Sequence, residues 1–203
     1  DIADASIQGL AEAMVGRQVH MGRQGDAKGA PGAVALEAVG LTVRDALQVE
    51  RLRGVSIRLR AGEIVGVAGV AGNGQSELLE VLSGLRAPQE GRLTVAAESF
   101  GPARWLDPRG ARALGIAHVP EDRHARAMVM SFGAWESAVL GYEELPVYSS
   151  PRGWMRHRRM RDATAALMQR FDVRPRNPAL ASSKFSGGNQ QKLVLAREIG
   201  QAP

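Results

Sequence analysis

Cysteine is absent from the 203 residues, which excludes disulfide bonds and thiolate metal sites and is compatible with a reducing cytosol. No apolar run approaches the roughly 20 residues that span a membrane, and the N-terminal residues lack the pattern of a secretory signal peptide. A strong charge of one sign is also missing: 26 Lys and Arg stand against 21 Asp and Glu, a net charge of +5. This mild excess does not by itself indicate a nucleic-acid ligand.

The length of the chain allows one large domain, and a hydrophobic content of 44% allows a core. The chain begins at Asp1 without methionine and stops at Pro203, just after an expected helix, so we expect it to be a piece of a longer protein. A helical pattern over residues 7–15 and the glycine-rich polar residues after it predict that 1–32 are the tail of a preceding domain and a linker. We expect the compact domain at 33–203.

A glycine-rich turn between a predicted strand (64–68) and a predicted helix (78–82) is the most informative stretch. Glycine allows positive φ, so backbone N–H groups can turn toward an anion, and the helix N-terminus adds a favourable dipole. The turn therefore predicts a phosphate-binding loop, in which the Ser76 hydroxyl can reach a phosphate-bound Mg²⁺. The residues of this predicted loop are Gly69, Gly72, Asn73, Gly74, Gln75, Ser76 and Glu77.

Gln75 is the exception in this loop. The spacing matches G-x-x-x-x-G-K-[ST] at every fixed position except the lysine, which Gln75 replaces. Glutamine keeps the length and a donor but loses the charge that meets the β- and γ-phosphates. We therefore expect weak phosphate binding and poor hydrolysis at this loop; the alternative is a glycine-rich turn without a ligand.

Further segments predict an α/β domain. Strands are expected over 34–43, 55–60, 92–95 and 116–119, and helices over 108–114, 132–140 and 154–171. Asp107 is the expected N-cap of the first of these helices, with Pro108 at its first position. The last helix is expected to have one apolar face, formed by Met160, Thr164, Leu167, Met168 and Phe171. The arginine-rich run 152–161 is expected to be a solvated helix face, because the aromatics of a nucleic-acid stacking platform are missing beyond Trp154.

A second glycine-opened helix follows near the end of the chain. Ser186, Gly187 and Gly188 open a helix that is expected to continue to Gly200, and they form a second helix N-terminus suited to an anion. Taken alone, this Ser-Gly-Gly could equally be a simple helix cap.

The two glycine loops together resemble the ATP-binding subunits of ABC transporters. Phe185 to Lys192 is similar to the signature of that family, with Phe185 in place of leucine and Asn189 in place of glutamine. The Asn-Gln-Gln-Lys that ends this stretch, the Met-Val-Gly-Arg at 14–17 and the Gly-Asn-Gly-Gln-Ser at 72–76 resemble the second nucleotide-binding domain of tandem simple-sugar and nucleoside importers.

The chain departs from that family at several positions. Gln75 replaces the phosphate lysine, and Glu121 stands at the glutamine-loop position, where the family senses Mg²⁺ and the attacking water. No aromatic residue for adenine stacking lies between Val34 and Gly69. The family's acidic strand, with its catalytic glutamate and later histidine, follows the signature helix, and the sequence ends before it.

The resemblance implies a P-loop NTPase fold of ABC type, truncated at the C-terminus. It would have a mostly parallel core sheet, an antiparallel β portion at 34–60 and 92–96, and a helical lobe near 132–172. In this family two domains pair head to tail, and each ATP lies between one phosphate loop and the other signature. This domain would then have a weak ATP and Mg²⁺ loop and an intact signature, Ser186, Gly187 and Gly188, that acts in trans.

The same resemblance implies a set of partners and a location. The expected partners are a first nucleotide-binding domain in the same chain, transmembrane permease subunits and, indirectly, a periplasmic or lipid-anchored substrate-binding protein, with no nucleic acid. The expected place is the cytoplasmic face of the membrane. Two alternatives remain open: a non-catalytic nucleotide-responsive domain, and a soluble ABC ATPase that acts on nucleic acid through the arginine-rich run. The transported substrate is not encoded here.

Overall fold

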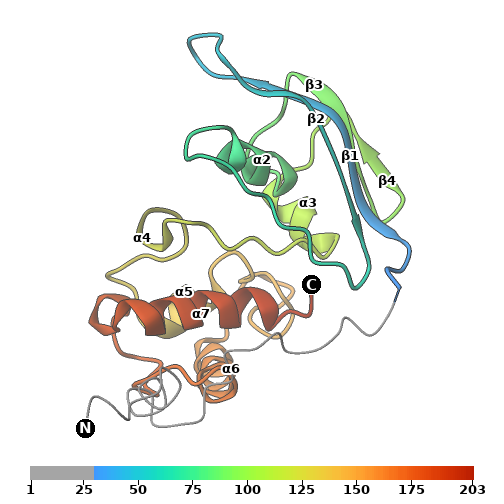
Figure 1. Ribbon diagram of the computed structural model, residues 1–203. Helices are drawn as coiled ribbons and strands as arrows, with labels where there is room; N and C mark the ends of the chain where they lie inside the picture. The colour runs from blue at the N-terminus through green and yellow to red at the C-terminus, as the bar shows by residue number, and fades with distance from the viewer. Residues whose placement is uncertain (1–29) are drawn as a thin grey trace, which may run out of the picture.

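The computed structural model describes residues 30–203, so the helix predicted over 7–15 lies outside the described residues. In chain order the elements are β1 (Val34–Arg44), β2 (Glu50–Arg60), α2 (Gln75–Leu82), β3 (Glu90–Val95), β4 (Glu98–Phe100), α3 (Pro108–Ala113), α4 (Arg123–Arg126), α5 (Ala134–Val139), α6 (His157–Arg170), the 3-10 turn η2 (Ser182–Lys184) and α7 (Gly187–Ile199). The sheet, α2 and α3 form one group, α5, α6 and α7 form another, and the segment with α4 lies between them (Figure 1). None of the helices described here is long and apolar enough to cross a membrane.

The sheet has the order β2-β1-β3-β4 and is antiparallel throughout. Leu36 and Ala38 of β1 are buried in alternation, as a strand with one face on the core requires. The register then shifts between Ala38 and Leu41, where Gly40 has φ 65°. Glycine adopts this left-handed backbone without strain, and the extra residue keeps Leu41 and Val43 on the core side.

The expected parallel core sheet is not formed within residues 30–203. The segments 64–68 and 116–119, predicted as strands, have no strand structure, and the Ile64 side chain is 98% exposed. A strand exists through its hydrogen bonds to a neighbour, so an apolar run without a paired neighbour in the described part of the chain does not become one. The predictions of these two strands are therefore wrong for this structure. The antiparallel strands predicted over 34–43, 55–60 and 92–95 are confirmed.

Helices α2 and α3 pack on the sheet through one core. Leu78 and Val81 of α2 are buried in the same cluster as Leu93 of β3 and Ala111 of α3. The predicted cap of α3 is confirmed, because the Asp107 carboxylate accepts from the Gly110 N–H at 2.6 Å. This packing positions the N-terminus of α2, where the glycine-rich loop ends.

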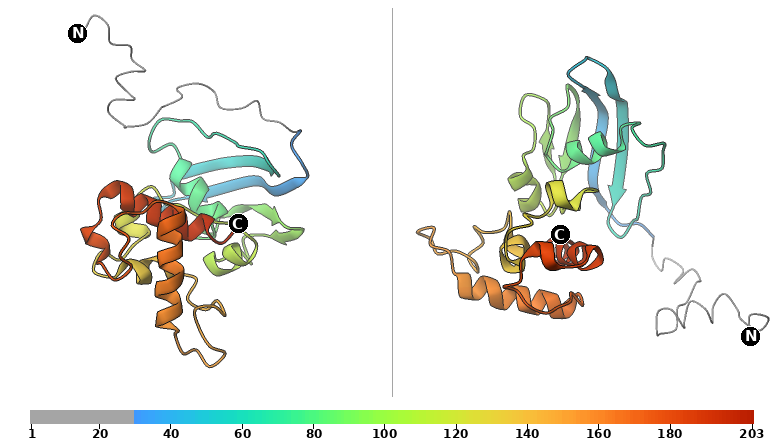
Figure 2. Two further views of the ribbon diagram at one scale, coloured as in Figure 1. Left: turned by 90° about the horizontal axis from the view of Figure 1, so that it is seen from below. Right: turned by 90° about the vertical axis from the view of Figure 1, so that its left-hand side faces the viewer.

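The helices predicted over 132–140 and 154–171 are present but shorter, as α5 and α6. α6 buries Met160, Thr164 and Met168, which the sequence places on one face. α5 and α6 pack against each other and against α7, and the connection between α5 and α6 extends to one side (Figure 2). This group of helices carries the Ser-Gly-Gly stretch at the start of α7.

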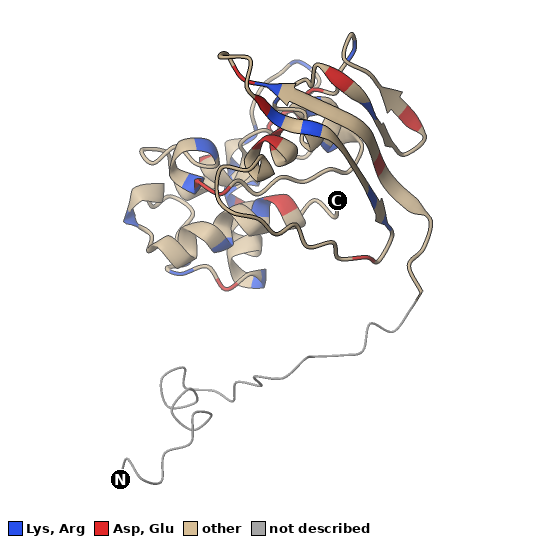
Figure 3. Cartoon of the chain, turned by 45° about the horizontal axis from the view of Figure 1, so that its top comes forward, with Lys and Arg blue, Asp and Glu red and all other residues tan. Residues whose placement is uncertain are grey.

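Charged residues of both signs are spread over the sheet and the helices (Figure 3). Within residues 30–203 one ion pair is buried. Arg197 Nε lies 2.7 Å from Glu198 Oε1, and Arg197 Nη1 donates to the carbonyls of Ala127 at 2.7 Å and Ser137 at 3.1 Å. The Tyr142 hydroxyl donates to Glu198 Oε2 at 2.7 Å. Burial and the neighbouring carboxylate raise the pKa of Tyr142 to about 12. These contacts connect α7 to α5 through Ser137, and to the segments before and after α5 through Ala127 and Tyr142.

Candidate functional site: two glycine-opened helices

Two glycines shape the phosphate loop where α2 begins. Gly72 has φ 86° and Gly74 has φ 99°, both left-handed. A Cβ on Gly74 would stand 2.4 Å from the Arg51 carbonyl oxygen of β2, so a side chain at this position would force the loop away from the sheet. The predicted strand-side support is missing, but the turn and the helix start that the sequence predicts are both present.

The Gln75 side chain closes this loop on itself. Its Nε2 donates to the Val70 carbonyl at 3.1 Å, and the Asn73 N–H donates to the same carbonyl at 3.2 Å. A Cβ on Gly69 would lie 2.2 Å from Gln75 Nε2, so the amide lies directly over the start of the loop. A neutral amide therefore occupies the position that the sequence pattern assigns to an ammonium.

Ser76 and Glu121, both predicted site residues, meet beside α2. Ser76 Oγ donates to Glu121 Oε2 at 3.4 Å, and both line a cavity of about 320 Å³ together with His118. Burial lowers the pKa of His118, which favours its neutral form. Glu77 lies in the first turn of α2, where the helix dipole stabilises a carboxylate.

Oxygen ligands of this kind suit Mg²⁺. Within residues 30–203, however, no three His, Asp or Glu side chains gather into a self-contained metal site. One hydroxyl, such as that of Ser76, fits a cation that takes most of its ligands from a bound phosphate and water, as Mg²⁺ does in nucleotide sites.

The signature stretch forms the start of α7, with Ser186 as its N-cap. The Ser186 hydroxyl does not cap the backbone of its own helix; Ser186 Oγ accepts instead from Asn189 Nδ2 at 2.9 Å. A Cβ on Gly188 would meet nothing within 4 Å, whereas one on Gly187 would lie 2.7 Å from Arg123 Nη2. Ser186 and Gly188 are both exposed, so the first turn of α7 is accessible from outside the chain.

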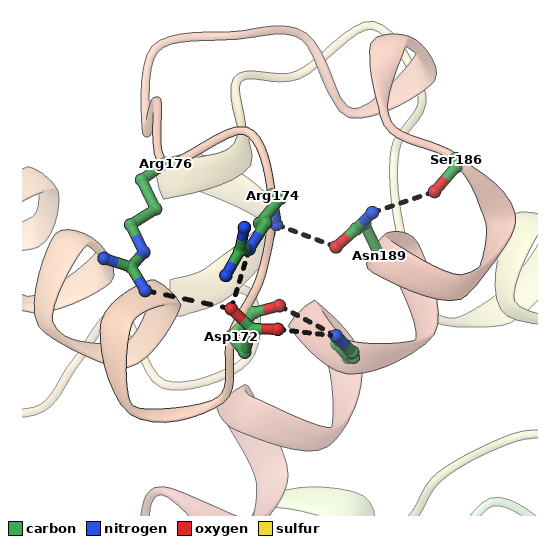
Figure 4. A network of polar contacts seen from close by, with 6 residues as sticks. Asp172, Arg174, Arg176, Ser186 and Asn189 are labelled. Carbon is green, nitrogen blue, oxygen red and sulfur yellow. Dashed lines mark hydrogen bonds and ion pairs between the residues drawn. The ribbon is translucent and has the colours of Figure 1, made fainter. Parts of the chain in front are cut away.

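Residues in the connection from α6 to α7 form hydrogen bonds with side chains of the first turns of α7 (Figure 4). The Arg174 N–H donates to Asn189 Oδ1 at 2.7 Å, and Lys192 Nζ donates to the Asp172 carbonyl at 2.9 Å. Asp172 also accepts from Arg174 Nε at 2.8 Å. The Arg174 and Lys192 side chains lower the pKa of the Asp172 carboxyl. The connection from α6 to α7 is therefore fastened to α7 at two points.

Sequence reasoning missed the residues beneath the signature. Gln190 is buried; its Oε1 lies 2.8 Å from His124 Nε2 and accepts from Arg123 Nε at 3.3 Å, while its Nε2 donates to the Ser182 carbonyl at 3.0 Å. The sequence does show a polar, charge-dense segment after residue 119, which could have indicated a buried polar contact. It does not indicate that this segment meets the helix that carries Gln190, more than 60 residues later.

The segment 120–126 contacts both glycine-opened helices. Glu121 meets Ser76, Arg126 Nη1 lies 2.5 Å from Glu80 Oε1 of α2, and Arg123 and His124 reach Gln190 of α7. The phosphate loop and the signature themselves lie in separate parts of the molecule (Figures 1 and 2). The described part of the chain therefore presents two helix starts suited to an anion, in separate parts of the fold.

Comparison with known families and curated proteins gives a consistent result. A family model described as "ABC transporter" matches residues 52–203. The guanosine import ATP-binding protein NupO of Bacillus subtilis is 38% identical over 204 residues, and the nucleoside import ATP-binding protein NupA of Lactococcus lactis is 36% identical. The ribose import ATP-binding protein RbsA of Shouchella clausii is 32% identical. The matches cover 100% of this chain but only 38–39% of these relatives.

Solved structures support the fold. A nucleotide-free ATP-binding cassette from an ABC transporter superimposes with a TM-score of 0.65 at 17% identity, over 84% of this chain and 66% of that one. A dimeric cassette bound to ADP and Pi gives a TM-score of 0.64 at 21% identity, over 83% and 70% of the two chains. At these identities the likeness shows the fold alone, and it confirms the cassette fold expected from the sequence.

Proposed function

Because this chain belongs to the ABC transporter family, whose model matches residues 52–203, we propose that it is the second nucleotide-binding domain of a tandem ATP-binding subunit. In this proposal its signature completes an ATP site on the partner domain, and its own phosphate loop contributes weakly. The observation that carries the proposal is the difference between the two loops: Ser186 and Gly188 are exposed and a Cβ on Gly188 meets nothing within 4 Å, whereas the Gln75 amide closes the phosphate loop.

The signature residues would act on the phosphates of a nucleotide held by the partner. The Ser186 hydroxyl and the N–H groups of the first turn of α7 are donors in a fixed position, and the helix dipole adds positive potential there. Donors that are in place before charge develops stabilise a transition state without reorganisation. The open space at Gly188 lets backbone approach phosphate closely.

The chain's own loop would bind ATP with Mg²⁺ less well. Ser76 would hold Mg²⁺. Glu121, whose Oε2 lies 3.4 Å from Ser76 Oγ, would lie near the reacting phosphate. Gln75 offers a neutral donor where the lysine of this motif offers a charge, so stabilisation of the γ-phosphate is reduced. We therefore propose that hydrolysis is concentrated at the site completed by Ser186, Gly187 and Gly188.

The relatives suggest what the whole protein does. NupO, NupA and RbsA are named as import ATP-binding proteins for guanosine, nucleosides and ribose. We propose that ATP binding and hydrolysis here drive the import of a simple sugar or nucleoside. The partners would be a first nucleotide-binding domain, permease subunits and a substrate-binding protein, and the place would be the cytoplasmic face of the membrane.

A non-catalytic, nucleotide-responsive domain is the second candidate. The bond from Gln75 Nε2 to the Val70 carbonyl favours it, because the loop is satisfied without a phosphate. In that case, nucleotide binding at the loop would change the conformation of the domain. ATP would be hydrolysed neither at the site with this phosphate loop nor at the site that this signature completes.

ATPase assays on the tandem protein separate the two candidates. Ser186→Ala should lower kcat by at least about tenfold, in line with the loss of a preorganised donor, whereas Ser183→Ala, in the exposed turn just before it, should leave the rate unchanged. Residues 1–203 alone should show no turnover above background. An unchanged rate for Ser186→Ala would overturn the proposal in favour of the non-catalytic domain.

A further inference from the structure

We infer that Asn189 is a positioning residue: it turns the Ser186 hydroxyl proton outward and keeps the Ser186 oxygen from capping the first-turn N–H groups of α7, so that both kinds of donor are free for the anion that the signature meets. This inference rests on the proposed function of the signature. It concerns which hydrogen-bond donors of the signature, the Ser186 hydroxyl and the first-turn N–H groups, are free to meet a ligand.

The orientation of the Asn189 amide is fixed by a backbone group. The Arg174 N–H, 2.7 Å away, can only donate, so the atom that it meets must be the carbonyl oxygen Oδ1. The other end of the amide, Nδ2, then faces Ser186 Oγ at 2.9 Å. Because an amide nitrogen can only donate, Ser186 Oγ is the acceptor in this pair.

The Ser186 hydroxyl is thereby set up as a donor. Its oxygen takes a hydrogen bond from Asn189, so its own proton is left for another acceptor. An N-cap serine normally accepts from the backbone N–H two or three residues on, but Ser186 makes no such bond in the described structure. The backbone donors at the start of α7 consequently remain available for an anion.

The support behind Arg174 keeps this geometry in place. Asp172 accepts from Arg174 Nε at 2.8 Å, and Lys192 Nζ holds the Asp172 carbonyl at 2.9 Å. Figure 4 shows these contacts on the same side of the start of α7. Asp172, in the connection before α7, and Lys192, in α7, therefore both help to keep the Arg174 N–H against Asn189.

Three substitutions separate polarity from shape in the tandem protein. Asn189→Leu removes both hydrogen bonds and frees Ser186 to cap its own helix. Asn189→Asp keeps the acceptor for Arg174 but offers only oxygen to Ser186, so the Ser186 proton must turn inward. Asn189→Gln keeps both polarities on a longer side chain. We expect kcat to fall about three- to tenfold for Asn189→Leu, more for Asn189→Asp, and to stay near wild type for Asn189→Gln.

A double-mutant cycle with Ser186→Ala gives the decisive readout. If Asn189 acts through the Ser186 hydroxyl, adding Asn189→Leu to Ser186→Ala should cost less than about twofold, although the same change costs several-fold in the wild type. A full multiplicative loss in the double variant would overturn the inference, because Asn189 would then act by another route. An unchanged rate for Ser186→Ala alone would instead overturn the proposed function.

Asn177→Asp is the matched control. Asn177 is exposed in the same connection, and its Oδ1 accepts from the Ala179 N–H at 3.0 Å, a bond that aspartate keeps. It should leave kcat unchanged. The urea unfolding midpoint of each variant shows whether the fold is kept; a loss of activity in the Asn189 variants that merely follows a loss of stability would contradict the inference.

Discussion

The phosphate loop and the signature start from the same local design but are held very differently. Both are glycine-containing turns that open a helix. The backbone turn of the loop is closed by local bonds, from Gln75 Nε2 and the Asn73 N–H to the Val70 carbonyl, and the segment before it is exposed; the loop's one long-range hydrogen bond in the described structure is the 3.4 Å contact from Ser76 to Glu121. The signature is fastened to distant parts of the chain: Gln190 to His124, and Asn189 to Arg174.

This difference shows that preorganisation is supplied by the surroundings of a motif. A helix start whose donors are fixed by distant residues can meet a charge without rearranging. A turn whose own side chain fills it must first exchange that internal hydrogen bond for the ligand, and the exchange lowers the net gain. The comparison therefore predicts larger effects for changes near the signature than for equivalent changes near the loop.

The largest expected effect is on stability. Arg197→Ala would leave Glu198 buried with only the Tyr142 hydroxyl as partner, and the loss should be about 3–5 kcal/mol. Arg53→Ala makes the same substitution in β2, on the loop side of the molecule, at an exposed ion pair with Glu50, and should cost well under about 1 kcal/mol. Urea unfolding measures both. Equal losses would remove the contrast between the two regions.

The next largest effect should be on turnover in the tandem protein. Gly188→Asp introduces a carboxylate where phosphate approaches, and ATPase activity should fall on the order of 100-fold or more. A Cβ at this position meets nothing within 4 Å and Gly188 is exposed, so we expect the loss to report on the ligand and not on packing. Gln75→Ala should change activity only a few-fold, because the group that it removes is neutral. If Gln75→Ala were as damaging as Gly188→Asp, the division of labour between the loops would be wrong.

Restoring the charge tests why the loop is weak. We expect the unmodified chain to bind ATP with Kd in the high micromolar range or weaker, on the order of −5 kcal/mol. Gln75→Lys should tighten binding by roughly 1–3 kcal/mol, the worth of a charge-assisted hydrogen bond. Isothermal calorimetry with ATP and Mg²⁺ gives both values. Tight binding without the lysine, or no gain from it, would mean that charge is not what the loop lacks.

The smallest effect concerns pH and the support of the signature. The Arg174 and Lys192 side chains lower the pKa of Asp172 below its usual 3.8, so its contribution to stability is complete above that value and is lost as pH falls through the lowered folded-state pKa. The stability gap between wild type and Asp172→Asn should be small near neutral pH and should vanish in acid. Denaturation curves at both pH values check this, and a gap that grew in acid would reverse the assignment.

The elements that the sequence predicted well are those specified by local chemistry. The Asp107 cap, the buried face of α6 and the glycine turn before α2 each depend on residues within one or two turns of each other, so the pattern alone indicates them. The role of Gln75 as a donor was also readable, because residue type and spacing define it.

The misses required long-range information. The strands predicted over 64–68 and 116–119 depend on neighbours, which an apolar run does not name. Likewise, nothing in the segment 120–126 specifies that His124 and Arg123 meet Gln190. Asn189 was noted only as a replacement for glutamine, because the direction of its amide is set by a backbone N–H 15 residues earlier.

The exposed run Ile64-Val65-Gly66-Val67-Ala68-Gly69-Val70 has a consequence for handling the protein in solution. It carries no charge, no proline and three valines, and its backbone N–H and C=O groups belong to none of the strand pairings in residues 30–203. Such a stretch is a template for intermolecular β-pairing. We therefore expect self-association of this chain to increase with its concentration and to decrease when a partner segment covers these seven residues.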